Sequence, residues 1–313
     1  MKTLITGSIA YDTIMVFPDR FRNHLLADQL HILNVCFLTP EMRREYGGTA
    51  GNIAYNLRLL GEDSLVMATV GEDAGPYLER LRELAIGSDY LKRIPGEFTA
   101  QAFITTDLDD NQITAFHLGA MNYSHENHVT RSLGASLAII SPDGKEGMLQ
   151  HARECAEQGI DFVFDPGQGL PMFSGEELAE FVRLATYVAV NDYEGKLLEE
   201  RIGRRLDQLA RDVKALVYTM GAKGSVILAG GERYEMPCVE AQAVVDPTGC
   251  GDAYRAGLLY GIAHGWDWPS TGKLGALMGA IKIASRGAQN HVARRDEIES
   301  RFRRAFGYSP WKG

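Results

Sequence analysis

The sequence has few cysteines, no long apolar run and no basic cluster. Only four of its 313 residues are cysteines, and no pair has C-x-x-C spacing. We therefore expect free thiols rather than a disulfide framework or a zinc site. No apolar segment is long enough to span a bilayer and no signal-peptide pattern is present, so we expect a cytoplasmic protein without a membrane partner. A net charge of −9 without a Lys/Arg cluster argues against nucleic acid as a partner.

Motifs of several common enzyme classes are also missing. The chain has no G-x-x-x-x-G-K-[ST] phosphate loop, which excludes the P-loop kinases. No G-x-G-x-x-G follows the first apolar segment, which argues against a dinucleotide dehydrogenase, and no H-E-x-x-H marks a metalloprotease. The hydrophobic content of 45% is ample for a full core. We expect one large α/β domain over residues 1–313.

The most informative stretch covers residues 244–257. Val244 and Val245 are typical of a strand end, Pro247 stops that strand, and a glycine-flanked turn follows. The next residues place small side chains on one face, which predicts a helix that closely approaches another backbone. The unpaired N–H groups at such a helix start bind anions. Asp252, in the first turn, can accept a proton from a hydroxyl beside the anion, as phosphoryl transfer to an alcohol requires.

Two N-terminal stretches place further polar groups at turns. Residues 4–10 predict a short strand that opens into a turn, and Asp12 follows it. Ligands of open α/β sheets bind beyond the C-terminal strand ends, where one carboxylate can accept two hydrogen bonds from a diol. Residues 46–61 predict a glycine turn and then a helix with Asn52 in its first turn. A turn-capping aspartate and a plain helix start are the structural alternatives.

The rest of the chain alternates between strands and helices. This alternation predicts a mostly parallel sheet covered on both faces. We expect strands at 64–70, 137–141, 162–164, 188–190 and 215–218, and helices near 147–158, 176–184 and 196–211.

A second, smaller unit is indicated by period-two patterns. The pattern that starts at Phe98, a turn at 108–111 and a return strand at 113–119 predict a hairpin, and 30–37 could add an edge strand. We expect a small β lid formed by segments of about 13–46 and 97–121. A lid excludes water, which competes as a phosphoryl acceptor. His24 and His31 are expected at the surface.

These motifs resemble a known family in the correct order over almost the whole chain. Residues 246–252, D-P-T-G-C-G-D, closely resemble the second signature of the ribokinase/PfkB-type carbohydrate kinases. Residues 47–52, G-G-T-A-G-N, resemble the first signature. The resemblance implies a ribokinase-like fold, with a doubly wound, mostly parallel sheet, helices on both faces and a small β-sheet lid. It also implies an ATP-dependent, Mg²⁺-using kinase.

The second signature carries the chemistry in this family. The resemblance implies that Asp252 is the catalytic base. It implies that the turn amides of Gly249, Cys250 and Gly251 hold the transferring phosphate. Asp246 falls where many members bind a monovalent cation, so K⁺ is a possible further cofactor.

The resemblance also implies sites for both substrates. The implied contacts of the acceptor's hydroxyls are Asp12, Gly48 and Asn52. In the lid, Phe103, Phe116 and Met121 could contact a base or fill the lid core. The implied ATP-binding residues are Asn191, Glu194, Thr219, Gly221, Gly224 and Asn290, and Glu194 would bind Mg²⁺ through water. Asp165 could shape the site or cap a turn. A hairpin is the structural alternative for 219–225.

The class of the phosphoryl acceptor is inferred from differences between this sequence and the ribokinases. Ribokinases usually carry a lysine in the first signature, and Gly47 to Asn52 contain none. The long stretch between Asp12 and Gly47 also allows a larger lid than a simple sugar needs. Both features resemble the adenosine and broader nucleoside kinases, so we expect a nucleoside kinase of purine salvage, with adenosine as the first candidate. A ribokinase- or fructokinase-like sugar kinase and a non-catalytic ligand sensor are the alternatives, and the protein could be a monomer or a homodimer.

Overall fold

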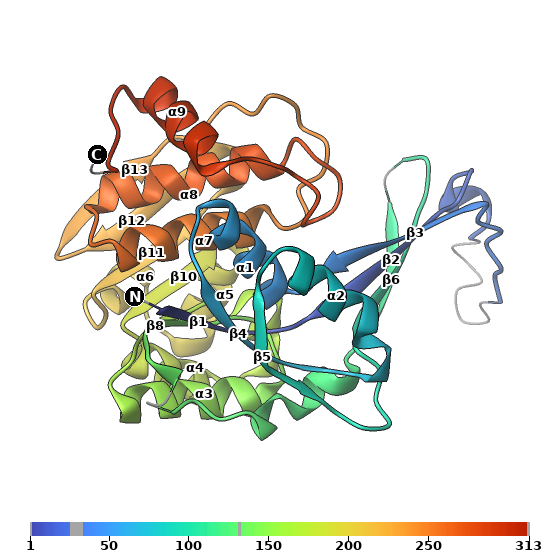
Figure 1. Cartoon of the computed structure of the whole chain (residues 1–313), viewed down its shortest axis with the longest axis horizontal. Coiled ribbons are helices and arrows are strands. Elements are labelled where there is room, and N and C mark those ends of the chain that lie inside the picture. The colour runs from blue at the N-terminus through green and yellow to red at the C-terminus, as the bar shows by residue number, and fades with distance from the viewer. Residues whose placement is uncertain (1, 26–33, 110, 131–132, 312–313) are drawn as a thin grey trace.

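The computed structural model describes residues 2–25, 34–109, 111–130 and 133–311, and its centre is a nine-stranded sheet (Figure 1). The strand order is β13-β12-β11-β10-β9-β8-β1-β4-β5. All neighbours from β11 to β5 are parallel, and β12 and β13 extend the sheet in antiparallel fashion. The strands are β1 (Lys2–Thr6), β4 (Ser64–Val70), β5 (Gly87–Arg93), β8 (Ala135–Ile140), β9 (Asp161–Phe164), β10 (Tyr187–Asn191), β11 (Ala215–Thr219), β12 (Ser225–Ala229) and β13 (Glu232–Met236).

Side chains of the sheet alternate between two buried layers. Ile5 and Ile139 belong to one hydrophobic cluster, whereas their chain neighbours Leu4 and Ile140 belong to the other. This period of two follows from strand geometry. The first layer is covered by α1 (Thr49–Leu59), α2 (Gly75–Glu83), α7 (Cys250–Ala263), α8 (Trp268–Lys282) and α9 (Arg295–Phe306). The second is covered by α3 (Lys145–Gln158), α4 (Gly175–Leu184), α5 (Asp192–Ile202) and α6 (Leu206–Leu209). The expected sheet with helices on both faces is confirmed.

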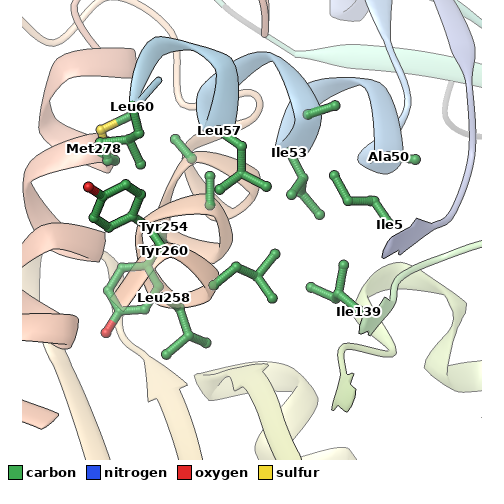
Figure 2. Close-up of a cluster of buried hydrophobic side chains, with 14 of the residues drawn as sticks. Ile5, Ala50, Ile53, Leu57, Leu60, Ile139, Tyr254, Leu258, Tyr260 and Met278 are labelled. Carbon is green, nitrogen blue, oxygen red and sulfur yellow. The ribbon is translucent and has the colours of Figure 1, made fainter. Parts of the chain in front are cut away.

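The first layer is built around α7, which packs between α1, α8 and the sheet (Figure 2). Leu57 of α1, Leu258 of α7 and Met278 of α8 meet in this cluster. A Cβ atom on Gly257 would lie 2.7 Å from the backbone of Gly275, so only glycine permits this approach of α7 to α8. The close approach predicted from the small side chains of this helix is confirmed.

The second sheet forms the lid, which extends away from the body of the molecule (Figure 1). Its strands are β3 (Glu41–Gly47), β2 (Ala10–Val16), β6 (Ala100–Thr106) and β7 (Gln112–His117), in this order. The pairs β2–β3 and β6–β7 are antiparallel, and β2 runs parallel to β6. Short 3₁₀ helices complete the fold: η1 (Phe21–Asn23), η3 (Glu72–Ala74), η4 (Gly119–Glu126), η6 (Gly167–Met172) and η7 (Gly221–Lys223).

Three expected elements differ from the structure. The helix expected over 196–211 is interrupted after α5, because Gly203 adopts a left-handed conformation (φ 73°) that ends the helix. Val244 and Val245 form no strand; they lie in an irregular segment and are 80% and 47% exposed. The edge strand expected at 30–37 lies partly outside the described residues, its described part is irregular, and the lid's edge is β3 instead.

All four cysteines are free thiols, as expected. His24 lies at the surface, as predicted, whereas His31 and part of the 108–111 turn lie outside the described residues. In the described ranges, no helix combines the length and apolar character needed to cross a bilayer.

Candidate active site

A pocket of about 630 Å³ lies between the C-terminal ends of the central strands and the lid sheet. The residues singled out from the sequence that line it are Asp12, Gly48, Asn52, Phe116, Met121, Asp165, Asn191, Glu194, Thr219, Gly249, Gly251 and Asp252. Those that lie outside its lining are Phe103, Gly221, Gly224, Asp246, Cys250 and Asn290. Lining residues that sequence reasoning missed include Ser8, Thr49, Gln168, Met172 and Arg255. The structure thus brings most of the predicted set into one cavity.

The glycine turn before α7 forms one wall of this pocket. Gly249 caps the helix with a left-handed backbone (φ 79°), and a Cβ atom there would lie 2.8 Å from Cβ of Ala288. Glycine is therefore required at this position. A Cβ atom on Gly251 would meet nothing within 4 Å, so this side of the turn is open. The N–H of Cys250 donates to the carbonyl oxygen of Pro247 (3.1 Å), so an anion would be held mainly by the other N–H groups at this helix start, which have no partner inside the helix.

Asp252 lies on the floor of the pocket, in the first turn of α7. Its Oδ2 accepts a 2.8 Å hydrogen bond from Nδ2 of Asn52. Burial raises the pKa of Asp252 to about 7; the Asn52 amide opposes this rise, Asp165 adds to it and Arg255 opposes it. Sequence reasoning assigned this residue the ordinary value of about 3.9. The floor of the pocket therefore makes Asp252 a better proton acceptor than an exposed aspartate.

A chain of directed hydrogen bonds holds Asn52 in this orientation. Tyr77 donates its hydroxyl to the carbonyl oxygen of Gly47 (2.7 Å), so the same hydroxyl oxygen accepts from Nε2 of Gln289 (2.7 Å). Nε2 of Gln289 also donates to Oδ1 of Asn52 (2.9 Å). With Oδ1 occupied by a donor, the amide of Asn52 presents its NH₂ group to Asp252. Sequence reasoning missed Gln289, which is 1% exposed.

Arg255 is a buried cation among three acidic side chains. Its Nη2 donates to Oδ1 of Asp165 (2.9 Å), and both side chains are nearly inaccessible to solvent. Its charge also acts on Glu194 and Asp252, and these acidic neighbours raise its pKa against the effect of burial. Arg255 lies three residues after Asp252, on the same side of α7, and this spacing is the signal that could have identified it.

Asn191 and Glu194 form the start of α5. Oδ1 of Asn191 accepts from the N–H of Glu194 (2.7 Å), and Oε2 of Glu194 accepts from the N–H of Asn191 (2.7 Å), which is a capping box. Burial and the nearby Asp165 raise the pKa of Glu194, and Arg255 opposes this rise. Both residues line the pocket, as does Thr219 at the end of β11.

The inner face of the lid sheet closes the opposite side of the pocket. Strand alternation places Ala102 and Ile104 of β6 on this face, together with Thr114 and Phe116 of β7, and all four line the pocket. Phe103 belongs to the outer face by the same alternation. Asp12 of β2 also reaches the pocket; burial raises its pKa to about 6, and Glu45 and Asp246 add to this rise.

The residues around Asp246 do not resemble an open cation site. Oδ1 and Oδ2 of Asp246 accept hydrogen bonds from the N–H groups of Thr248 (2.9 Å) and Gly287 (2.8 Å). Its carbonyl oxygen accepts from Nζ of Lys282 (2.6 Å). The ammonium group of Lys282 thus lies beside Asp246, the residue for which the family resemblance implied a monovalent cation.

Asn290 contacts the lid. Its Nδ2 donates to Oε2 of Glu45 on β3 (2.7 Å).

Among the described residues, no group of three or more His, Cys, Asp or Glu side chains is arranged to hold a metal ion. Asp165 and Glu194 are carboxylates of the pocket lining that an ion held mainly by phosphate and water could approach.

Comparisons with known proteins agree on one family. The family model of pfkB family carbohydrate kinases matches residues 20–294. A nucleoside kinase of Methanocaldococcus jannaschii is 33% identical over 270 residues, covering 86% of this chain and 89% of that protein. The structure of Burkholderia thailandensis nucleoside kinase in complex with inosine is 53% identical, with a TM-score of 0.90 and coverage of 99% and 100% of the two chains. Its complex described as ADP-inosine has 54% identity, a TM-score of 0.88 and coverage of 99% and 98%.

Proposed function

The chain belongs to the PfkB family of carbohydrate kinases, and from this premise we propose that it transfers the γ-phosphate of ATP to the 5′-hydroxyl of a nucleoside. The relatives named nucleoside kinase cover nearly the full chain in both directions, which supports this acceptor class. Adenosine is the first candidate from the sequence, and inosine is the nucleoside named with the Burkholderia enzyme. The expected products are a nucleoside 5′-monophosphate and ADP.

The observation that carries the proposal is the position of Asp252 beside the anion-binding turn. The turn formed by Gly249, Cys250 and Gly251 begins α7, and Asp252 lies one residue further on the pocket floor. A hydroxyl between them would have a proton acceptor on one side and the phosphoryl group on the other. Phosphoryl transfer depends mainly on such positioning and on charge stabilisation.

We assign the remaining contacts to the two substrates. Asp12, Gly48 and Asn52 bind the ribose hydroxyls. Position 48 requires glycine, because its φ is 84° and a Cβ atom there would lie 2.5 Å from the backbone of Ser8 and Ala10. On the ATP side we assign Asn191, Glu194, Thr219, Gly221, Gly224 and Asn290. Mg²⁺, when bound with ATP, would neutralise phosphate charge, and Asn191 and Glu194 would hold its water ligands.

The apolar lid face favours a nucleoside over a small sugar. Ile104, Phe116, Leu118 and Met121 form an apolar part of the pocket wall. A flat base can cover such a wall with its ring face, whereas a sugar would leave it exposed to water. A sugar kinase is the second candidate, because distant ribokinases also match this chain.

The experiment is a substrate panel with product identification. The purified protein is incubated with Mg²⁺-ATP and adenosine, inosine, cytidine, ribose or fructose, and products are identified by mass spectrometry and ³¹P NMR. The proposal predicts a nucleoside 5′-monophosphate in amounts equal to ADP. Faster phosphorylation of ribose or fructose would favour the sugar kinase, and binding without ADP formation would favour a sensor.

A further inference from the structure

Lys282, the last residue of α8, is a buried cation outside the pocket described above. Its side chain is 0% exposed, and its Nζ donates to the carbonyl oxygens of Asp246 (2.6 Å) and Ser285 (3.1 Å). Burial lowers the pKa of Lys282, and the carboxylate of Asp246 opposes this effect. Buried lysines are rare unless their charge is compensated, so a specific role for this one is expected.

The ammonium group joins two loops that meet beside the pocket. One loop, residues 245–249, leads into the turn before α7, and the other, residues 283–289, follows α8. The N–H groups of Val245 (2.9 Å) and Asp246 (3.1 Å) both donate to the carbonyl oxygen of Ile283. The N–H of Gly287 donates to the Asp246 carboxylate. Lys282 joins the same two loops through its side chain, because its Nζ bonds one carbonyl oxygen in each of them.

The second loop supports both parts of the proposed reaction site. Ala288 packs closely on Gly249: a Cβ atom added to Gly249 would lie 2.8 Å from Cβ of Ala288. This contact therefore sets the position of the anion-binding turn. The next residue, Gln289, orients Asn52 and through it Asp252. A shift of either loop would therefore move the phosphate-binding turn and the base together.

Carbonyl oxygens and one nearby carboxylate are also the groups that bind an alkali-metal cation. A potassium ion is held by carbonyl oxygens that replace its water shell, and a lysine ammonium group is a compact unit charge that carries three donors. The two cations can thus satisfy the same oxygen atoms, but they cannot do so at once. A cation that is covalently attached to α8 need not be bound from solution, so no translational entropy is lost when it occupies the site. It is also present at every salt concentration.

We propose that Lys282 is a tethered monovalent cation that positions the anion-binding turn and the base, and that this chain therefore needs no K⁺ for activity. Lys282 would be a positioning residue, since it lies outside the pocket lining. The activity measurements rest on the proposed kinase function, whereas a binding measurement on the folded protein does not.

The activity experiment compares cations at constant ionic strength. Wild type and Lys282→Ala are assayed with nucleoside and the Tris salt of ATP in KCl, NH₄Cl or choline chloride. Wild type should have the same kcat in all three salts. In choline, Lys282→Ala should lose on the order of 10- to 100-fold in kcat, because small displacements of catalytic groups have effects of this size. K⁺ or NH₄⁺, but not choline, should restore part of this loss.

A second measurement is independent of catalysis. The melting temperature of each protein is recorded in the same salts, and K⁺ should raise it for Lys282→Ala only, since a cation that binds the folded state stabilises it. Lys273→Ala is the matched control, because Lys273 lies on the same helix but its Nζ donates to Tyr308 (3.4 Å). This variant should behave as wild type.

Two results would overturn the inference. One is stimulation of wild type by K⁺ over choline, which would reveal a separate cation site. The other is a folded Lys282→Ala protein whose kcat in choline chloride equals that of wild type. A folded Lys282→Ala protein whose activity and melting temperature do not change when K⁺ or NH₄⁺ replaces choline would count equally against it. Absence of nucleoside phosphorylation by wild type in every salt would instead contradict the proposed function, and the melting experiment would still test the cation role.

Discussion

At the scale of single residues, Asp252 depends on its surroundings for its chemistry. An exposed aspartate has a pKa of about 3.9 and is a weak base at neutral pH. Burial raises the pKa of Asp252 to about 7, close to neutral pH. A general base is most effective when its pKa lies near the operating pH. The local environment therefore matters as much as the residue type.

This environment predicts an acid limb in the pH profile. Asp252 acts as a base only when it is deprotonated, so kcat/KM for the nucleoside should fall as the pH decreases through about 7. The charged groups that face it are Asp165, Arg255 and Asp12. The profile is measured by steady-state kinetics from acidic to alkaline pH. Asp12→Asn removes another pocket carboxyl whose pKa is raised, and this variant should bind nucleoside more weakly but keep the acid limb. A profile that is flat through neutral pH would contradict the assignment.

Gln289 gives a second prediction, on the orientation of Asn52. In Gln289→Leu nothing holds Oδ1 of Asn52, so its amide can turn this oxygen toward Asp252, which favours the protonated carboxyl. The acid limb of kcat/KM should move to higher pH, and kcat at pH 7 should fall.

Gln150→Leu serves as the matched control for this change. Nε2 of Gln150 donates to the carbonyl oxygens of His125 (3.0 Å) and Asn127 (2.8 Å), away from the pocket lining. It should lower stability without moving the limb. An unchanged limb in Gln289→Leu would show that Gln289 has a purely structural role.

Sequence reasoning recovered the residues that belong to short, continuous motifs. Gly249, Asn52 and Asp252 each lie in such a motif, and all three line the pocket. Gln289 and Lys282 carry no local signal, because their roles come from partners that are distant in the chain. Gln289 meets Asn52 across a separation of 237 residues.

At the scale of elements, the lid sheet shows how strand alternation selects residues. Phe103 and Phe116 are both aromatic and equally exposed, at 42%, and sequence reasoning could not separate them. The register pairs Phe116 with Ala102 and Phe103 with Ala115, so the two rings lie on opposite faces. Only the face of Phe116 lines the pocket.

This difference predicts contrasting effects of the same substitution. Phe116→Ala should raise KM for the nucleoside by about tenfold, equivalent to about 1.4 kcal/mol of lost contact. Phe103→Ala should leave KM and kcat unchanged. Steady-state kinetics with nucleoside and ATP varied in turn distinguish the two outcomes. Equal effects of both substitutions would show that the lid acts only through its overall packing.

The main elements were predictable, and the errors have local causes. Buried strands and amphipathic helices have clear periodicity, so the alternating core was recovered. The break after α5 depends on the left-handed Gly203, which a polar helical pattern conceals. Val244 and Val245 suggested a strand, but the backbone N–H of Val245 bonds the loop after α8 and not a neighbouring strand.

At the scale of the whole molecule, the pocket depends on chain segments that are far apart. The lid supplies the wall with Phe116, the strand ends supply Asp165 and Asn191, and α7 supplies Asp252. The hydrogen bond between Asn52 and Asp252 spans 200 residues. Local motifs therefore identified these residues, but only the sheet topology shows that they face one cavity.

The most direct test of this assembly is the comparison of wild type with Asp252→Asn. Nucleoside binding is measured by calorimetry and turnover by nucleoside 5′-monophosphate formation. If Asp252 accepts the proton of the 5′-hydroxyl, the variant should bind the nucleoside almost as well as wild type, while kcat falls by about 10² or more. A variant with ordinary turnover would contradict the account, because phosphoryl transfer would then proceed without the proposed proton acceptor.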